Sequence, residues 1–344
     1  MYNINNILTS PNITKDGCVE LLSAASDDNI KLIFDTASKI RKECLGDGIY
    51  LRGLLEFSNF CGNNCAYCGL TSLNTKLRRY CMTKAEILES VGLIVKHNIG
   101  TVVLQSGEYD GLDPQWFADV IKTIRSLYKN LAITLSVGEK TFEDYKLWKE
   151  SGADRFLLKM ETLDKNLYDS LHPGMSFENR KNCLARLKEL GYQTGSGNIV
   201  GLPNQTNESI ANDLIYFRNE NFDMVSISPF IPHPLTSLKD SKIADVKETL
   251  KVMAIARIMT KNAHIPATTA LGSMGQDYRI DGLKAGANVM MPNFTPGPYR
   301  EYYEIYPNKR CVNEEAGQCS GCMRMMSVEI GRYIAQGRGD TLKN

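Results

Sequence analysis

Short apolar runs of strand length alternate with longer amphipathic segments along most of this 344-residue sequence. The apolar runs predict strands at residues 51–57, 101–106, 131–137, 155–160, 194–200, 224–230, 265–270 and 287–291. The intervening segments predict helices at residues 83–98, 114–128, 141–151, 176–190, 206–220, 245–261 and 275–285. Strict alternation is typical of a parallel sheet with helical crossovers, and eight strands suit a closed barrel. We therefore expect an α/β fold, a (β/α)8 TIM-type barrel, with a doubly wound open sheet as the alternative.

A further segment flanks the predicted barrel, residues 51–297, on each side. Residues 1–50 have helical spacing and are expected to form an N-terminal helical cap. Residues 298–344 form a C-terminal extension that begins with an aromatic stretch, carries a second cysteine group and ends in a predicted helix near 322–336.

The charge balance excludes broad anion-binding surfaces. Lys and Arg number 40 against 39 Asp and Glu, for a formal net charge of +1, so we expect neither nucleic acid nor a membrane as a partner. The N-terminus is polar and no long apolar run occurs, which predicts a cytoplasmic protein. The ten cysteines are then expected to be reduced thiols or metal ligands.

Three closely spaced cysteines follow the first predicted strand, in Cys61-Gly-Asn-Asn-Cys65-Ala-Tyr-Cys68. Close thiols can hold an iron–sulfur cluster, and three of them would leave one iron of a cubane without a protein ligand. Such an iron can bind a small molecule, as the open position of a catalytic zinc does. A zinc site is one alternative, although the nearest histidine, His97, lies far downstream. Three unrelated core thiols are another, although Gly-Asn-Asn is typical of a loop.

The CxxxCxxC spacing, with Tyr67 before the last thiol, resembles the cysteine loop of radical S-adenosylmethionine (SAM) enzymes. The resemblance implies a 4Fe–4S cluster on Cys61, Cys65 and Cys68, whose open iron is chelated by the amino and carboxylate groups of SAM. It also implies a reducing electron donor, because one electron cleaves SAM to methionine and a 5′-deoxyadenosyl radical.

Polar residues at the C-terminal ends of barrel strands are the candidates for binding SAM. The segment from Gln105 to Glu108 resembles the family's glycine-rich segment, where a glycine permits close approach and an oxygen accepts from the SAM ammonium. Glu161 and Arg180 are predicted to bracket the ribose hydroxyls and the carboxylate, with a structural ion pair as the alternative. The expected SAM-binding residues are Tyr67, Gln105, Ser106, Gly107, Glu108, Ser136, Glu161, Arg180, Pro229, Ile231 and Tyr303.

Other strand ends are candidates for binding the substrate. The adjacent threonines at 268 and 269 are expected to hold a small anion or carboxylate, and Tyr303 and Tyr306 to cover the barrel mouth. The expected substrate-binding residues are Thr134, Lys159, Met224, Thr268, Thr269, Met291 and Tyr306.

The second cysteine group, Cys311, Cys319 and Cys322, lies outside the predicted strands. It is expected to hold an auxiliary, non-catalytic 2Fe–2S or 4Fe–4S cluster with water or another non-protein ligand at the fourth position. A zinc site and an unoccupied site are the alternatives.

Longer stretches resemble the HydE family of FeFe-hydrogenase maturases, among them Pro229-Phe-Ile-Pro-His-Pro, Ile265-Pro-Ala-Thr-Thr-Ala and Met291-Pro-Asn-Phe-Thr-Pro. This resemblance implies a small organometallic substrate, an iron carrying carbonyl, cyanide and cysteine, and other hydrogenase maturases as partners. One difference is that Lys159-Met160 stands where that family tends to have Arg-His, so the bidentate fork of arginine is absent.

Two other functions stay open from the sequence. An amino-acid mutase resembling methylornithine synthase would use the same cysteine loop on an amino-acid-like substrate. A non-catalytic iron–sulfur scaffold or carrier protein would need no SAM pocket. Biotin synthase is less favoured, because its second cluster uses thiols inside the barrel that these strand ends lack.

Overall fold

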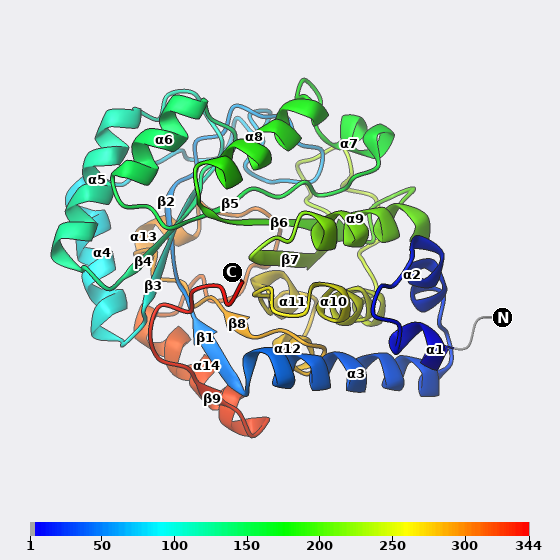
Figure 1. Ribbon diagram of the computed structural model, residues 1–344. Helices are drawn as coiled ribbons and strands as arrows, with labels where there is room; N and C mark the ends of the chain where they lie inside the picture. The colour runs from blue at the N-terminus through cyan, green and yellow to red at the C-terminus, as the bar shows by residue number, and fades with distance from the viewer. Residues whose placement is uncertain (1–3, 344) are drawn as a thin grey trace.

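Six parallel strands in chain order form most of a barrel in the computed structural model, which describes residues 4–343 (Figure 1). The strands are β2 (Gly53–Ser58), β3 (Thr101–Ser106), β4 (Ala132–Ser136), β5 (Arg155–Leu157), β6 (Gln193–Val200) and β7 (Met224–Pro229). The helices that connect them and cover their outer face are α4 (Lys84–Lys96), α5 (Pro114–Leu127), α6 (Phe142–Glu150), α8 (Phe177–Glu189), α9 (Asn207–Asn219) and α10 (Val246–Thr260).

Shorter segments close the ring between β7 and β2. They are residues 264–266, β8 (Val289–Met290) and β1 (Gly48–Leu51), all in parallel pairing. Backbone hydrogen bonds of 2.9 to 3.0 Å join them in turn, from Val225 N to His264 O, Ala267 N to Val289 O, Tyr50 N to Asn288 O and Leu54 N to Pro292 O. The expected TIM-type architecture is therefore confirmed.

The core lies between the sheet and the helices. Phe117 on α5 is fully buried and contacts Phe57 of β2 and Trp148 of α6, with ring centroids 5.1 Å apart in both pairs. Rings on the outward faces of strands thus bury the apolar stripes of the crossover helices. The inward faces are free to carry polar side chains.

The prediction of a strand at residues 265–270 was wrong beyond its first residues. Thr268 turns the chain into the short helix α11 (Thr269–Gly272), because its Oγ1 atom accepts a hydrogen bond from Leu271 N at 3.4 Å. The helix predicted at 275–285 is confined to α12 (Arg279–Lys284). A helix that the sequence analysis missed, α7 (Lys165–Leu171), begins after Asp164, whose side chain accepts from Leu167 N.

The helical lead-in is confirmed for α1 (Ile4–Leu8), α2 (Lys15–Leu22) and α3 (Asp27–Leu45). Helix α2 contacts α9 and α3 contacts α10, so these helices cover one flank of the barrel. Because β1 starts before residue 51 and pairs with β8, the barrel takes in the end of the predicted cap. The three-part division into domains stays a prediction.

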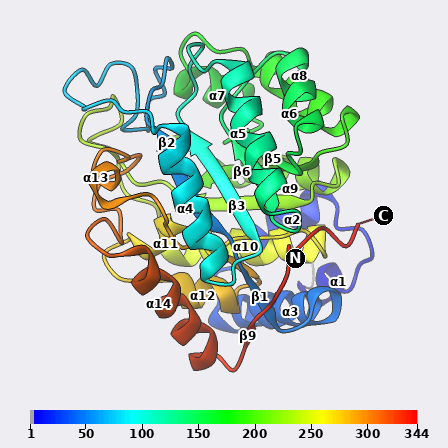
Figure 2. The ribbon, with the colours of Figure 1, turned by 90° about the vertical axis from the view of Figure 1, so that its left-hand side faces the viewer.

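The C-terminal extension runs along the outside of the barrel and across its N-terminal end (Figure 2). It comprises α13 (Gly297–Arg300), α14 (Ala316–Glu329) and β9 (Tyr333–Ile334), which pairs with β1. The helix predicted at 322–336 was therefore placed too late. Beyond β9, Asp340 Oδ1 lies 2.7 Å from Nη2 of the fully buried Arg155, so the chain end closes the bottom of the barrel. Among residues 4–343, no helix has the length and apolarity needed to cross a membrane.

Candidate active site

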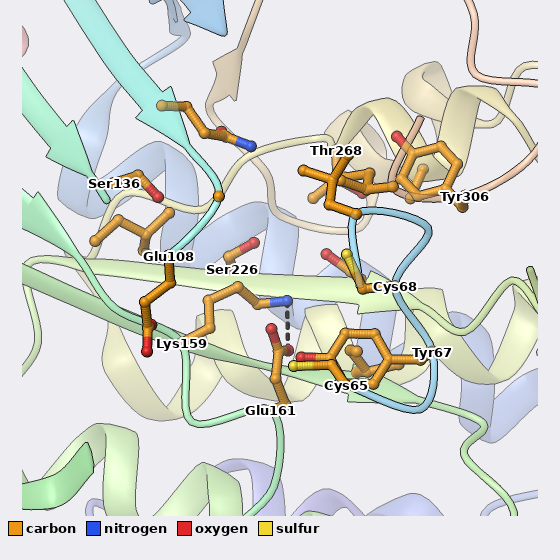
Figure 3. A pocket seen from close by; sticks show the side chains of 18 of the residues that line it. Cys65, Tyr67, Cys68, Glu108, Ser136, Lys159, Glu161, Ser226, Thr268 and Tyr306 are labelled. Carbon is orange, nitrogen blue, oxygen red and sulfur yellow. Dashed lines mark ion pairs between the residues drawn. The ribbon is translucent and has the colours of Figure 1, made fainter. Parts of the chain in front are cut away.

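A cavity of about 320 Å³ lies at the C-terminal ends of the barrel strands. Its wall includes all three thiols of the cysteine loop and residues from the ends of β2 to β7, and segment 303–309 of the extension contributes the remaining side (Figure 3). The predicted site residues in the wall are Cys61, Cys65, Tyr67, Cys68, Gln105, Ser106, Gly107, Glu108, Ser136, Lys159, Glu161, Arg180, Pro229, Ile231, Thr268, Thr269, Met291, Tyr303 and Tyr306.

Two predicted substrate-binding residues lie outside this wall. Met224 is the first residue of β7, towards the N-terminal end of the barrel, where its sulfur lies 2.9 Å from Nη1 of Arg52. Thr134 shares a face of β4 with Ser136 but lies deeper in the barrel, with its hydroxyl buried. Neither side chain lines the cavity, and their role in binding a substrate stays a prediction.

The cysteine loop is fixed by backbone hydrogen bonds to three different parts of the fold. Gly62 N donates to Glu108 O at 2.7 Å, Ala66 N to Leu171 O at 2.9 Å, and Gly69 N to Ile305 O at 3.0 Å. A Cβ atom on Gly107 would lie 2.2 Å from the carbonyl oxygen of Phe60, so only glycine allows this approach of β3 to the loop. The segment from Gln105 to Glu108 therefore abuts the cysteine loop.

The three thiols fit a positively charged metal centre. Burial raises the pKa of Cys68 to about 12, and burial together with the charges of Cys68 and Cys61 raises the pKa of Cys65. Cys65 and Cys68 would therefore stay protonated without a cation to compensate their thiolates. Iron supplies that charge, and the remaining cavity space leaves room for a ligand beside it.

Arg180 and two carboxylates form a charged cluster on the wall. Nε of Arg180 lies 2.8 Å from Glu139 Oε1, and Nη1 lies 3.4 Å from Glu108 Oε2. Burial opposes the charge of Arg180, but the two carboxylates raise its pKa above the ordinary value. Arg180 therefore stays charged in the cavity, and its partners are Glu108 and Glu139 instead of Glu161.

Glu161 pairs with Lys159 across the cavity wall. Lys159 Nζ lies 2.7 Å from Glu161 Oε2 (Figure 3). Glu161 has a φ angle of +65°, a left-handed conformation that is uncommon for a residue with a side chain. Its backbone is held to β6, because Glu161 N donates to Gly197 O and Ile199 N donates to Glu161 O, both at 3.0 Å.

Tyr67 is oriented by a histidine that the sequence analysis missed. Its hydroxyl lies 3.0 Å from Nε2 of His172, and Nδ1 of His172 lies 3.0 Å from Tyr168 O. A carbonyl only accepts, so Nδ1 carries the proton and Nε2 accepts from the Tyr67 hydroxyl. Burial and the charge of Arg180 lower the pKa of His172 to about 3, so the imidazole stays neutral.

A buried ion pair between Glu56 and Lys309 was also missed. Lys309 Nζ contacts Glu56 Oε1, and their side chains are 4% and 1% exposed. Glu56 Oε2 accepts from Asn293 Nδ2 at 3.0 Å, and Lys309 Nζ donates to Tyr303 O at 3.0 Å. A glutamate inside an apolar predicted strand was the only sequence signal. The pair fastens segment 303–309 over the cavity.

The two threonines that were expected to bind an anion lie on the side of the cavity that faces the C-terminal extension. Thr268 and Thr269 line the cavity at the start of α11, and Figure 3 shows Thr268 beside Tyr306 and facing Cys68. The α11 turn that overturned the predicted strand brings both threonines to the wall. Ser226 and Ser228 of β7 line the cavity as well and were not predicted.

Known proteins resemble this chain in sequence and in fold. The profile of the radical SAM superfamily matches residues 55–217. The FeFe hydrogenase maturase subunit HydE of Thermotoga maritima is 46% identical over 319 residues, which cover 93% of this chain and 91% of that protein. The 3-methylornithine synthase of Methanosarcina acetivorans is 29% identical over 81% of this chain and 79% of its own.

A solved structure agrees with the sequence comparisons. The crystal structure of methylornithine synthase (PylB) matches with a TM-score of 0.85 and 26% identity over 97% of both chains. Membership of the radical SAM superfamily implies a 4Fe–4S cluster and SAM, which the thiol-lined cavity fits. The chain therefore belongs to the radical SAM superfamily of enzymes and, within it, to the HydE family.

Proposed function

We propose that this enzyme acts as a HydE-type maturase, which uses SAM in the described cavity to process a small organometallic iron compound for the di-iron subcluster of an FeFe hydrogenase. The observation that carries the proposal is the 46% identity to the Thermotoga maritima HydE over nearly the whole chain. When bound, the cluster supplies the electron that cleaves SAM, and the protein holds and orients the reactants.

The charged residues suit the two ends of SAM. Cys61, Cys65 and Cys68 would hold the cluster, and the oxygens of Glu108 would accept from the SAM ammonium. Arg180, kept charged by its carboxylate neighbours, would attract the SAM carboxylate. Glu161 would accept from the ribose hydroxyls, and the buried surroundings exclude water from the reacting centre.

Lys159 and the two threonines suit an anionic substrate. Lys159, Thr268 and Thr269 line the same cavity as the thiols, and they offer one positive charge and two hydroxyls. Cyanide and carboxylate groups of an iron complex would find donors there. The proposal includes the organometallic compound as substrate, a reducing electron donor and the other hydrogenase maturases as partners. The free thiols also suit a reducing, cytoplasmic compartment.

The test is anaerobic maturation in vitro. Reconstituted, reduced protein is expected to form 5′-deoxyadenosine and, with the other maturases, to activate an apo FeFe hydrogenase. A protein that cleaves SAM but never supports activation, while 3-methylornithine accumulates from an amino-acid mixture, would favour the synthase function instead. If fully reconstituted protein formed no 5′-deoxyadenosine, the function of a non-catalytic scaffold or carrier protein would be favoured instead.

The tail cysteines enter the same proposal. Cys311, Cys319 and Cys322 would hold an auxiliary iron–sulfur cluster outside the cavity, since none of them lines its wall. This cluster would have no part in SAM cleavage.

A further inference from the structure

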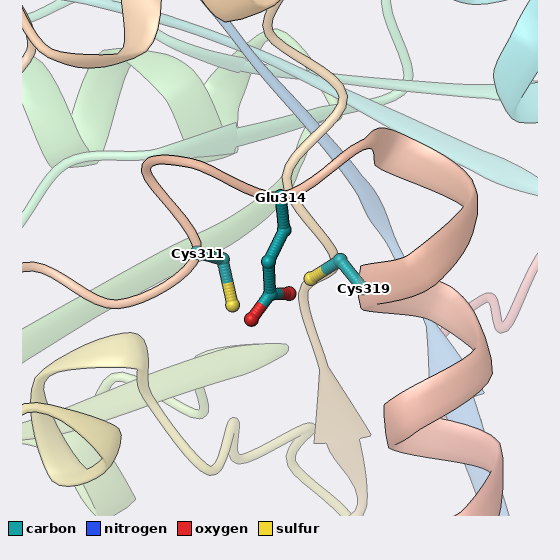
Figure 4. Close-up of side chains that lie close together, drawn as sticks. All are labelled: Cys311, Glu314 and Cys319. Carbon is teal, nitrogen blue, oxygen red and sulfur yellow. The ribbon is translucent and has the colours of Figure 1, made fainter.

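One fully buried carboxylate of the barrel, that of Asp213 on α9, has no part in the proposed function. It differs in this from the carboxylate of Glu314, which has an oxygen within 4.8 Å of the Sγ atoms of Cys311 and Cys319 in the extension (Figure 4). Asp213 also lies outside the wall of the cavity. Any influence of Asp213 on the reactants must therefore act through the residues that it contacts.

The two carboxylate oxygens of Asp213 accept one hydrogen bond each. Oδ1 accepts from the backbone N–H of Leu163 at 2.6 Å, and Oδ2 accepts from Nδ2 of Asn198 at 2.9 Å. Asn198 is a fully buried residue of β6, and Leu163 lies in the segment between β5 and α7. From the side of α9, which covers the outer face of the sheet, Asp213 thus joins the end of β5 to its neighbouring strand (Figure 1).

A carboxylate is costly at this place. Burial raises the pKa of Asp213 to about 7, the two hydrogen bonds oppose this change, and the charges of Asp164 and Glu161 add to it. A buried polar group stabilises a fold only through the hydrogen bonds that it makes. The benefit of an aspartate here therefore lies in the two N–H groups that it holds.

Both of these groups adjoin Glu161, the left-handed residue of the cavity wall. Asn198 is the partner of Glu161 in a parallel bridge, and Leu163 follows Glu161 by two residues. The φ angle of +65° costs free energy in a residue with a side chain, and such a conformation persists only where the surroundings fix it. Asp213 holds the chain on both sides of the bridge, and it thereby opposes relaxation of Glu161.

We propose that Asp213 is a positioning residue for SAM, which fixes from the outer face of the barrel the turn that points the Glu161 carboxylate into the cavity. The inference rests on the proposed function, in which Glu161 accepts from the ribose hydroxyls. With the turn fixed, the carboxylate stands in the cavity wall beside Lys159 before SAM arrives. Binding then needs less reordering of the protein, which favours affinity.

The first measurement is hydrogen exchange of residues 160–164 in the iron-free protein, followed by mass spectrometry. Asp213→Leu removes both acceptors but is close to aspartate in size, so it changes hydrogen bonding more than packing. It is expected to speed exchange in this segment severalfold, because the N–H of Leu163 loses its acceptor. Asp213→Ala, which leaves a small cavity instead, is measured in parallel and is expected to behave in the same way.

The second measurement is the dissociation constant of SAM on anaerobically reconstituted protein, by calorimetry. Asp213→Leu is expected to weaken SAM binding roughly tenfold, as for one displaced hydrogen-bond acceptor. Asp213→Asn should stay within about threefold of wild type, because its amide oxygen still accepts from Leu163 N. In a Glu161→Ala background, Asp213→Leu should have no further effect, because both changes act through the same carboxylate.

Leu214→Ala is the matched control, since Leu214 is a fully buried residue of the same helix outside the cavity wall. It is expected to lower the free energy of unfolding and to leave SAM affinity unchanged.

Three outcomes would overturn the inference. Unchanged exchange or unchanged SAM affinity in both Asp213→Leu and Asp213→Ala, with binding weakened in Glu161→Ala, would overturn it and leave the proposed function intact. Losses of affinity that multiply in the double variant would mean a general loosening of the fold and would overturn it as well. Wild-type protein that carries its cluster but binds no SAM would overturn the proposed function and, with it, the role of Asp213.

Discussion

Nζ of Lys159 lies 2.7 Å from Oε2 of Glu161, and both side chains line the cavity that holds the cysteine loop. The two side chains are 20% and 12% exposed, so water screens the pair only in part. The left-handed backbone of Glu161 turns its carboxylate towards the lysine. The ion pair thus links Glu161, the proposed acceptor for the ribose hydroxyls of SAM, to Lys159, the proposed cation for the substrate.

We expect Lys159→Met to weaken the binding of SAM. Without its ammonium partner, the Glu161 carboxylate loses an ion pair at 2.7 Å. The pair is little exposed, so its contribution should lie between that of a surface pair, under about 1 kcal/mol, and that of a buried one, about 3 to 5 kcal/mol. The KM for SAM in 5′-deoxyadenosine formation should rise roughly tenfold, which corresponds to about 1.4 kcal/mol. Lys159→Arg is the control and should keep the KM within about threefold, because the charge is retained. An unchanged KM in Lys159→Met would show that the lysine does not support Glu161.

Cys65→Ser is expected to abolish SAM cleavage, whereas Cys319→Ser should retain most of it. Cys65 lines the cavity and Cys319 does not, so only the first change would remove a ligand of the proposed SAM-binding cluster. Iron content and 5′-deoxyadenosine yield are measured after identical anaerobic reconstitution. An equal loss of product in the two variants would contradict the separation of the two cysteine groups.

The neutral state of His172 predicts a pH dependence of stability. Its pKa is lowered from 6.5 to about 3 in the folded protein, so the unfolded chain binds more protons between these values. Its contribution to the free energy of unfolding is therefore complete above pH 6.5 and is lost as the pH falls towards 3. The difference between wild type and His172→Gln should shrink as the pH is lowered from about 7 to about 4. Denaturant unfolding of the iron-free proteins measures it, and a difference that does not vary with pH would contradict the prediction.

Local sequence was enough to predict the parts of the site that lie within one loop or one strand end. The three cluster thiols lie within one short loop, and the segment from Gln105 to Glu108 directly follows β3, so barrel topology alone placed them together. The boundaries of the six crossover helices α4, α5, α6, α8, α9 and α10 followed for a similar reason, since polar caps and apolar stripes are local features.

Contacts between distant segments could not be predicted in the same way. Tyr67 and His172 are 105 positions apart, and Glu56 and Lys309 are 253 positions apart. Nothing in the local pattern around His172 or Lys309 indicates that the side chain reaches the cavity. Thr268 misled the strand prediction because a threonine favours a strand but also caps a helix. The depth of Met224 in the barrel, at the first residue of β7, was likewise not evident from its phase along the strand.

The last prediction concerns the Glu56–Lys309 pair, which fastens the extension to the start of the barrel. The side chains are 4% exposed for Lys309 and 1% for Glu56, so removing the lysine leaves a buried carboxylate whose remaining partners, among the residues that the structure describes, are Asn293 and Thr295. Breaking a buried pair in this way typically costs about 3 to 5 kcal/mol. We expect a loss of this order in the free energy of unfolding of Lys309→Met, measured by denaturant titration of the iron-free protein.

Two further variants separate charge from packing. Glu56→Gln combined with Lys309→Met should recover much of the loss, because no charge is then left buried without a partner. Lys165→Met is the matched control, since the Lys165–Asp169 pair is 62% and 47% exposed and such surface pairs contribute under about 1 kcal/mol. If Lys309→Met cost no more than Lys165→Met, the pair would not be what holds segment 303–309 over the cavity. The KM for SAM is measured on the same variants. If Lys309→Met cost several kcal/mol and the double variant recovered stability but not the KM for SAM, Lys309 would also take part in binding the reactants.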